Sequence, residues 1–311
     1  MPAPRPFRFG VQASRAGSRT EWVELARKAE DLGYSVLTVA DHLDDQFATT
    51  PALMAAADAT TTLRIGSLVY ASDYHHPVVL AKEAATLDLL SDGRLELGLG
   101  AGWMPEDYAG AGIAFDPAPE RIARLAEAVT VIKGLHGDGP CDVDGDHFQV
   151  HLDGFPKPIQ RPHPPILIGG GGRSILTLAG READIVGLNI DLRSGRIDAS
   201  AGPTATAEAT DEKIRWIRAA AGDRFDQIEL QVRIHLALVT DDLDTVATSL
   251  APAFGLSPEQ GLETPHALAG SVDQIVDTCL ARRDRFGIST IGLSADVMET
   301  MAPVVARLAG S

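Results

Sequence analysis

The chain has 311 residues, of which 45% are hydrophobic and 23% are charged. These values are ordinary for a globular protein and exclude a disordered chain, a collagen-like fibre and a coiled coil. Lysine and arginine number 27 against 43 aspartates and glutamates, so the net charge is −16. Such a surface repels nucleic acid and anionic lipid, and we expect neither a nucleic acid nor a membrane as a partner.

The two cysteines, Cys141 and Cys279, lie far apart and form no C-x-x-C pattern. We therefore expect neither a disulfide framework nor a zinc site, and a reducing cytoplasm is the expected compartment. The N-terminus is proline-rich without an apolar run, and no uncharged apolar stretch reaches the roughly 18 residues of a membrane helix. We expect no signal peptide and no membrane span.

Short apolar runs alternate with amphipathic stretches along the first part of the chain. Continuous apolar runs of strand length predict strands at 7–12, 36–40, 63–70 and 95–99. Helical signals predict helices at 22–32, 51–60, 77–90 and 120–132. A capping box at Ser18 opens the first of these helices and Gly33 ends it.

Two segments interrupt this alternation. Residues 137–164 are rich in Gly, Pro and Asp, and the alternation at 147–150 predicts a small hairpin in an insertion. Residues 189–206 are polar and contain Gly and Ser, which predicts a mobile loop and a candidate lid. Elsewhere we predict strands at 166–168, 185–188, 228–239 and 291–293, and helices at 174–179, 207–221, 241–250, 271–285 and 298–308.

Eight apolar strands that alternate with helices need helices on both faces of a parallel sheet. A (β/α)8 TIM barrel satisfies this count, as a single domain over residues 1–311 with insertions near 137–164 and 189–206. The competing architecture is an open doubly wound sheet. It is disfavoured because no mononucleotide-binding half is repeated.

Barrel enzymes carry their reactive groups where strands end. Asp41 and His42 follow the second predicted strand, and together they offer an acceptor and a group that exchanges protons near neutral pH. The alternative is that Asp41 caps a helix and His42 is a surface loop residue. His75 and His76 are adjacent, which points them apart, and no metal-ligand spacing accompanies them, so we expect no metal site.

Two glycine-rich segments follow predicted strands. In the first, Gly98 to Trp103, the spacing is not that of a dinucleotide fingerprint; Gly100 and Gly102 could admit a flat ring beside Trp103, or form a tight turn with Trp103 in the core. In the second, Gly169, Gly170, Gly171 and Gly172 precede Arg173 at a helix start. Exposed backbone N–H groups and a guanidinium there predict a phosphate site, with a merely flexible loop as the alternative.

Three carboxylates, Glu106, Asp107 and Asp116, could form the acidic pair of a hydrolase. Their spacing does not favour that chemistry, and a solvated loop is the expected environment. The sequence carries no nucleophile elbow, no Walker A motif and no kinase motifs.

A series of segments taken together resembles the luciferase-like monooxygenase superfamily. These segments are Asp41-His42, Leu63 to Gly66, His76-Pro77, Thr86 to Arg94, Gly98 to Trp103, Arg121 with Glu127, Pro156 to Gln160 and Pro164 to Gly170. The resemblance runs from residue 7 to about 190 and is weaker beyond. It implies a TIM barrel with insertions.

Members of the superfamily use reduced FMN with oxygen or the deazaflavin coenzyme F420, and this chain is more similar to the F420-dependent oxidoreductases of actinobacterial type. The resemblance implies that His42 exchanges the proton and that Asp41 lies near the ring. It places Ser67, Leu68 and Val69 behind the ring, with a non-prolyl cis peptide around Leu68 and Val69. The Gly169 to Arg173 loop would hold the cofactor phosphate.

The sequence departs from the superfamily at Trp103, where the sugar-phosphate dehydrogenases have a glutamate, so a glucose 6-phosphate substrate is disfavoured. The polyanionic tail of F420 needs local positive charge. Candidate contacts are Arg173, Arg181, Arg193 and Arg196.

Three functions follow from these observations. The first is an F420-dependent oxidoreductase that moves a hydride between the deazaflavin and an organic small-molecule substrate. The second is an FMN-dependent monooxygenase supplied with reduced flavin by a partner reductase, and the third is a flavin-binding barrel without catalysis. The resemblance also implies a homodimer.

Overall fold

Eight parallel strands close into a barrel in the computed structural model, which describes residues 4–196 and 199–311. The strands are β1 (Arg8–Gln12), β2 (Val36–Val39), β3 (Arg64–Ser67), β5 (Leu95–Gly100), β8 (Ile166–Gly170), β9 (Ile185–Leu188), β10 (Glu229–Arg233) and β13 (Ile288–Ser294). They pair in the order β1, β2, β3, β5, β8, β9, β10, β13, and β13 pairs again with β1. The predicted TIM barrel is therefore confirmed, and the open sheet is excluded.

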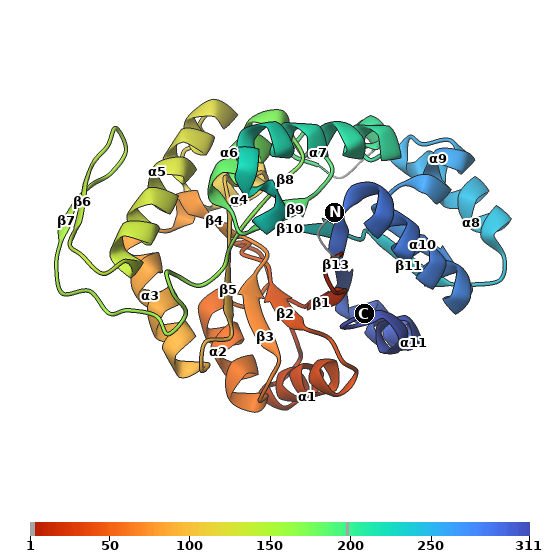
Figure 1. Ribbon diagram of the computed structural model, residues 1–311, viewed down its shortest axis with the longest axis horizontal. Coiled ribbons are helices and arrows are strands. Elements are labelled where there is room, and N and C mark those ends of the chain that lie inside the picture. Colours follow the sequence, from red (N-terminus) through yellow and green to blue (C-terminus); the bar gives the residue numbers. More distant parts are fainter. Residues whose placement is uncertain (1–3, 197–198) are drawn as a thin grey trace.

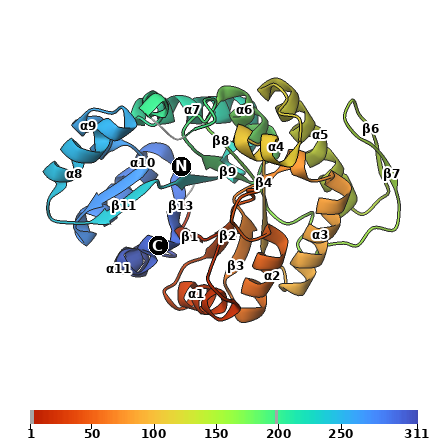
Figure 2. The same cartoon turned by 180° about the vertical axis from the view of Figure 1, so that it is seen from behind.

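Helices surround this barrel (Figures 1 and 2). The longer ones are α1 (Arg19–Asp31), α2 (Thr49–Ala59), α3 (Pro77–Leu90), α5 (Ala118–His136), α6 (Arg173–Glu182), α7 (Ala207–Ala221), α10 (Val272–Phe286) and α11 (Met298–Leu308). The strands are covered on both faces, and every residue of β2 and β9 is buried. This double burial explains why the strands are continuous apolar runs in the sequence rather than alternating ones.

The start of α1 is set by the capping residues that the sequence predicts. The Ser18 side chain accepts from the backbone N–H of Glu21 at 3.2 Å, which caps α1 as the sequence predicts. The Glu21 carboxylate accepts from the N–H of Gly17 at 2.7 Å rather than from that of Ser18, so the predicted capping box is displaced by one residue. The cap thus satisfies one free N–H group of the first helical turn, and the Glu21 carboxylate fixes the residue just before the cap.

The segment 228–239 was predicted as one strand, and this was wrong. Strand β10 ends at Arg233, and β11 (Leu236–Val239) pairs with β12 (Ala267–Gly270) in a separate two-stranded sheet. The backbone N–H of His235 donates to the carbonyl of His266, which directs the chain out of the barrel. Apolar patterning could not show this break, because both pieces contact buried side chains.

Two excursions flank the barrel on opposite sides in Figure 1. One is an antiparallel hairpin of β6 (Cys141–Asp144) and β7 (Gln149–Leu152), within the predicted insertion at 137–164. The other contains β11, α8 (Leu243–Leu250), α9 (Pro258–Glu263) and β12. The sequence predicted the helix at 241–250 but did not indicate that it belongs to an excursion from the barrel. The remaining short elements are α4 (Pro105–Ala111), β4 (Tyr70–Ala71) and the 3-10 turns η1 (Ser72–Tyr74), η2 (Ala199–Thr204), η3 (Gly222–Gln227), η4 (Ala251–Phe254) and η5 (Ala295–Val297).

An ionic network lies where the barrel strands begin. Arg8 of β1 pairs with Glu96 of β5 and, at 2.8 Å, with Glu229 of β10. Arg64 of β3 donates to Glu96 at 2.6 Å. The Glu96 side chain is 8% exposed, so its charge is stabilised by these two guanidinium groups rather than by water. This amino end of the barrel is a structural end, which leaves the carboxyl end for chemistry.

No helix in residues 4–196 and 199–311 is both long and apolar enough to span a membrane. Both cysteines are buried and free.

Candidate active site

The carboxyl ends of the eight strands meet at one end of the barrel, and Asp41 lies there, just after β2. Its Oδ2 accepts from the backbone N–H of Ala71 at 3.0 Å and lies 2.8 Å from Nε2 of His75. Its Oδ1 lies 3.3 Å from the hydroxyl of Thr49, at the start of α2. Asp41 therefore connects the end of β2 to β4 and to α2. Both of its carboxylate oxygens are already engaged by the protein.

His42 lies beside a carboxylate that the sequence did not assign to it. Its Nδ1 is 2.7 Å from Oδ2 of Asp107, and the side chains are 18% and 6% exposed. The hydroxyl of Tyr74 donates to the same oxygen at 3.4 Å. When Nδ1–H donates to Asp107, the lone pair is on Nε2, which makes this nitrogen a proton acceptor.

The prediction that Asp107 belongs to a solvated loop was wrong. Asp107 is the third residue of α4, is 7% exposed and projects toward His42 rather than into solvent. Glu106 is exposed, and Asp116 pairs with Arg124, so the three carboxylates form no acidic pair. Pro105 marks the start of α4, but no local signal in the sequence shows that Asp107 faces His42.

Tyr74 and Tyr108 line the same region. Burial and the carboxylate of Asp107 raise the pKa of Tyr74 above its ordinary value. The hydroxyl of Tyr108 donates to Asp73 at 2.9 Å, and burial together with this carboxylate raises the pKa of Tyr108. Both phenols are thus neutral donors, and both orient carboxylates of this region.

Trp103 lies next to His42. The two rings meet edge to face, with centroids 5.7 Å apart and planes at 87°. Trp103 is only partly buried, so it is not a core plug. It forms part of the surface from which His42 is reached.

The peptide bond between Leu68 and Val69 is cis, at the position that the resemblance implies. Both side chains are partly exposed. A Cβ on Gly100 would lie 2.5 Å from Cγ2 of Val69, and one on Gly169 would lie 3.5 Å from Cγ1 of Val69. The glycines of β5 and β8 therefore leave room for Val69, whose side chain lies between these strands.

Gly102 must be glycine because of its backbone conformation and its contact with Tyr108. Its φ is +72°, and a Cβ would lie 1.8 Å from the hydroxyl of Tyr108. Ser67 is buried, and its hydroxyl donates to the carbonyl of Gly98 at 2.7 Å and accepts from the N–H of Gly98 at 3.0 Å. These contacts are with the protein itself, so direct contact of Gly102 and Ser67 with a cofactor stays a prediction.

The second glycine segment spans the end of β8 and the start of α6. Gly169 and Gly170 are the last residues of β8, Gly172 caps α6 and Arg173 is its first residue. Arg173 is exposed and, within the described parts of the chain, makes no hydrogen bond or ion pair. A Cβ on Gly171 would lie 2.1 Å from the carbonyl oxygen of Ile190, so this position accepts only glycine.

A carboxylate lies close to the predicted phosphate site. A Cβ on Gly172 would be 3.5 Å from Oδ2 of Asp191, and the Asp191 side chain is 9% exposed and pairs with Arg193 at 2.8 Å. The negative charge of Asp191 near the start of α6 would repel a phosphate bound there. The phosphate site remains a prediction, and Asp191 is a neighbour that sequence reasoning did not identify.

The adjacent histidines have separate roles. His75 contacts Asp41, whereas Nδ1 of His76 accepts from the N–H of Val78 and caps α3. No cluster of metal-ligating side chains occurs in residues 4–196 and 199–311. His75 is therefore a partner of Asp41 that the sequence assigned only to a loop.

Two motif residues of the resemblance position loops. Arg121 donates to the carbonyl of Ala101 at 2.7 Å and to that of Gly102, which fixes the chain just before Trp103. The Glu127 carboxylate accepts from the N–H of His147 at 2.8 Å and from that of Phe148 at 3.1 Å. It thereby holds the turn of the β6–β7 hairpin on α5.

The predicted lid, 189–206, begins where β9 ends; residues 197 and 198 lie outside the described residues. The ammonium group of Lys213 donates to the carbonyl oxygens of Asn189 at 2.7 Å and Thr204 at 2.6 Å. Burial lowers the pKa of Lys213 to about 8. One buried amine thus joins the two ends of this segment.

A closed parallel barrel with a buried carboxylate and a histidine at the carboxyl end defines a class of TIM-barrel enzymes. The chain belongs to the luciferase-like monooxygenase family, whose pattern matches residues 5–272.

Its relatives include an F420-dependent dehydrogenase and a monooxygenase. The chain is 28% identical over 288 residues to an F420-dependent glucose-6-phosphate dehydrogenase of Nakamurella multipartita, which covers 88% of this chain and 80% of the relative. It is 40% identical over 134 residues to 4-hydroxyprotoasukamycin monooxygenase of Streptomyces nodosus subsp. asukaensis, covering 42% of this chain and 35% of the relative.

Among solved structures, the coenzyme F420-dependent tetrahydromethanopterin reductase of Methanopyrus kandleri matches with a TM-score of 0.77 at 20% identity. The match covers 98% of each chain. At this identity the likeness shows the shared fold.

Proposed function

We propose that this protein is an F420-dependent oxidoreductase that transfers a hydride between the deazaflavin and an organic substrate. The observation that carries the proposal is the pair of His42 and Asp107, 2.7 Å apart at the carboxyl end of a luciferase-like barrel. F420 dependence is in the names of the dehydrogenase relative and of the matched reductase structure.

The residues at this end fit such a cofactor. Leu68 and Val69 present partly exposed apolar side chains at the mouth of the barrel, where a flat ring can lie. Arg173, Arg193 and Arg196 are exposed, so these predicted contacts with a polyanionic tail are accessible. Arg181 lies in the last turn of α6, toward the amino end of the barrel, and is not part of this proposal. The ring would contact Leu68 and Val69, and the Gly169 to Arg173 loop would hold the phosphate.

When bound, the deazaflavin supplies the hydride acceptor or donor. The protein supplies the proton transfer: if the substrate is an alcohol, its C–H bond gives up a hydride and its O–H proton goes to Nε2 of His42. Asp107 holds Nδ1–H and stabilises the imidazolium that forms. In the reverse direction Nε2 returns the proton to the oxygen of the reduced carbonyl.

The substrate is not a sugar phosphate in this proposal. Trp103 occupies the position of the glutamate that the resemblance assigns to the sugar-phosphate dehydrogenases, and its ring lies against His42. The indole of Trp103 presents apolar surface at this position, whereas the carboxylate of a glutamate would accept hydrogen bonds from the hydroxyl groups of a sugar. The similarity to the relative from Nakamurella multipartita therefore supports the assignment of the cofactor more than that of the substrate.

Equilibrium titration with oxidised F420 and, separately, with FMN tests the cofactor. Saturable F420 binding with FMN at least tenfold weaker supports the proposal. Preference for FMN, with oxygen consumption coupled to flavin oxidation, would instead assign a two-component monooxygenase, which the monooxygenase relative favours. F420 binding without turnover of any substrate would leave a non-catalytic barrel.

We further propose a cytoplasmic homodimer, and a reductase that regenerates the reduced cofactor. Val79, Leu89 and Leu90 of α3 are 56%, 53% and 60% exposed, which is unusual for three large apolar side chains on one helix. A second copy of the chain would cover them. Sedimentation of wild type and Leu90→Glu tests this: a dimer that dissociates in the variant supports it, and a wild-type monomer contradicts it.

A further inference from the structure

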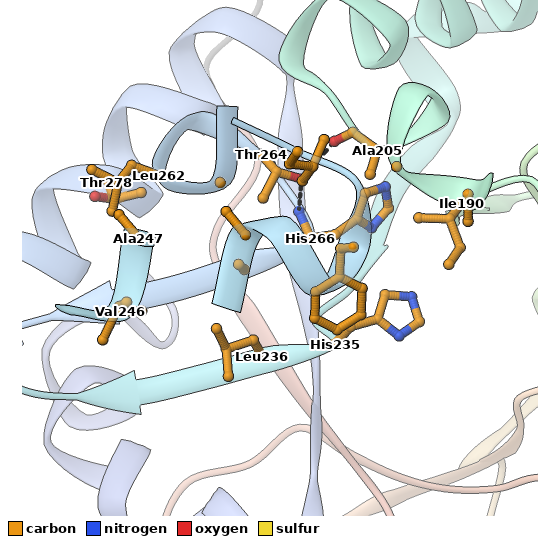
Figure 3. A pocket seen from close by; sticks show the side chains of 18 of the residues that line it. Ile190, Ala205, His235, Leu236, Val246, Ala247, Leu262, Thr264, His266 and Thr278 are labelled. Atoms are coloured by element: carbon orange, nitrogen blue, oxygen red, sulfur yellow. Dashed lines mark hydrogen bonds between the residues drawn. The ribbon is translucent and has the colours of Figure 1, made fainter. Parts of the chain in front are cut away.

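A pocket with about 780 Å³ of empty space, part of it open to solvent, lies beside the barrel. Its walls come from the two segments that follow β9 and β10, with β12 and α10. Its apolar lining includes Ile190, Leu236, Val246, Phe254, Leu256 and Leu262. Figure 3 shows the imidazole rings of His235 and His266 on the same side of the pocket as Ile190. None of the predicted cofactor residues lines it.

The position of this pocket relates it to the barrel mouth. Ile190 follows β9 and His235 follows β10, so both lie at the carboxyl end of the barrel. In the closed ring of strands, β9 is four strands from β2 in either direction. The pocket therefore lies at the carboxyl end, on the side of the barrel across from His42.

One polar group on the pocket wall has no partner. Nδ1 of His266 is 2.9 Å from the carbonyl of Arg233, so it carries the hydrogen and donates. Nε2 is then an acceptor, and it is buried without a hydrogen bond. His266 is 3% exposed, and burial, with the nearby charges of Lys213 and Arg282, lowers its pKa well below the ordinary value. A neutral ring with a free lone pair calls for an O–H or N–H donor.

Three further polar groups of the pocket, on Thr264, His235 and Arg282, already have hydrogen-bond partners. Thr264 donates its hydroxyl to the carbonyl of Ala205 at 2.5 Å, and Nε2 of His235 lies 2.8 Å from Oδ1 of Asn189. Arg282 donates to the carbonyl oxygens of Thr264 at 2.6 Å and Ala267 at 2.7 Å. Its guanidinium is thus directed at the backbone, so the lining offers no free charge for an anion.

We propose that this pocket binds the apolar part of the substrate, an uncharged molecule that presents one O–H or N–H donor to Nε2 of His266. The identification of this ligand as the substrate rests on the proposed function, whereas the existence of the site and the chemistry of its ligand do not. A hydrophobic pocket with one placed polar group is the usual form of a small-molecule site.

Three naphthalenes of nearly equal size test the chemistry of the site by fluorescence titration. They are 2-naphthol, an uncharged donor, 2-methoxynaphthalene, which lacks the donor, and 2-naphthoate, an anion. We expect saturable binding of 2-naphthol, about fivefold weaker binding of the ether because one hydrogen bond is lost, and still weaker binding of the anion. No saturable binding of 2-naphthol, or tighter binding of the anion, would overturn the site.

Two variants place the probe. In His266→Asn the side-chain amide can still donate to the carbonyl of Arg233, but the Nε2 acceptor is gone, so the preference for 2-naphthol over the ether should fall to less than twofold. Ala247→Phe fills the pocket from α8 and should abolish binding of both. The controls are His151→Asn in β7 and Ala306→Phe in α11, both exposed, which should bind like wild type. Binding that survives Ala247→Phe would place the probe elsewhere.

Reduction of F420 by uncharged secondary alcohols that carry a second O–H group, such as 6-(1-hydroxyethyl)-2-naphthol and 4-(4-hydroxyphenyl)-2-butanol, tests whether the ligand of this pocket is the substrate. The phenol would donate to Nε2 of His266, and the secondary alcohol would be the group that reacts at His42. We expect turnover with at least one alcohol, at least tenfold lower kcat/KM in Ala247→Phe, and F420 affinity within twofold of wild type. If both ligands bind but no alcohol is oxidised, the substrate assignment fails. If F420 does not bind but 2-naphthol does, the proposed function fails and the site stands.

Discussion

Oδ2 of Asp107 lies 2.7 Å from Nδ1 of His42, although the two residues are 65 positions apart in the chain. Asp107 comes from α4, whereas His42 follows β2. The carboxylate selects the tautomer in which Nε2 is free.

Asp107→Asn removes the charge and keeps the shape. We expect His42 to lose its single tautomer, because the amide can donate to Nδ1 as well as accept from it, and turnover to fall about 100-fold. Nitrogen-15 NMR of the His42 ring measures the tautomer directly. F420 affinity within twofold of wild type is the control, and an unchanged tautomer with unchanged turnover would remove Asp107 from the mechanism.

His42→Ala and Arg173→Ala should separate catalysis from binding. Loss of the proton acceptor is expected to lower kcat about 100-fold or more with little effect on F420 affinity. Loss of the exposed guanidinium at the start of α6 should weaken F420 binding about tenfold with kcat retained. Arg215→Ala, also exposed but within α7, is the matched control. The opposite pattern would exchange the two roles.

Asp191→Asn tests the predicted phosphate site. The carboxylate lies near Gly172 and would repel a phosphate bound there, so its removal should tighten F420 binding several-fold, most strongly at low salt. Titrations at two ionic strengths measure this. Weaker binding would mean that Asp191 orders the loop and that the phosphate lies elsewhere.

His235 makes the stability of the fold sensitive to acid. Burial, with Arg233 and Lys213 nearby, lowers its pKa to about 4 from an ordinary 6.5. Between pH 4 and pH 6.5 the imidazole of residue 235 takes up a proton in the unfolded chain more readily than in the folded chain. The contribution of His235 to the free energy of unfolding is therefore fully present above pH 6.5 and is lost as the pH falls toward 4. The loss approaches about 3 kcal/mol. Urea unfolding of His235→Gln should show a shallower decline across this range than wild type, and parallel curves would exclude His235 as the cause.

Glu96→Ala leaves Arg8 and Arg64 without their shared carboxylate at the amino end of the barrel. We expect a loss of about 3 kcal/mol in the free energy of unfolding, measured in urea, because the partly buried Arg64 loses its counter-charge and Arg8 keeps only Glu229. Glu299→Ala breaks the exposed pair with Lys28 and should change stability little. If the two substitutions lower the free energy of unfolding equally, the network around Glu96 stabilises the fold no more than an exposed ion pair does.

The sequence predicted the barrel well because strands buried on both faces are unbroken apolar runs. Its errors lie where a tertiary contact decides. The turn after Arg233 depends on a backbone bond from His235 to His266, which no local pattern encodes. Likewise His42 follows a strand and could be proposed, but Asp107 lies in a seven-residue helix whose buried face becomes visible only when β2 and α4 are placed together.

Lys213 ties Asn189 to Thr204, so the ends of the loop between them are fixed by a group outside it. A single amine on α7 therefore joins the start of this segment, just after β9, to its other end. The residues between, among them Ile190 and Ala201, form part of the wall of the apolar pocket, so a change of their side chains would alter the shape of that pocket while the anchor at Lys213 stays in place.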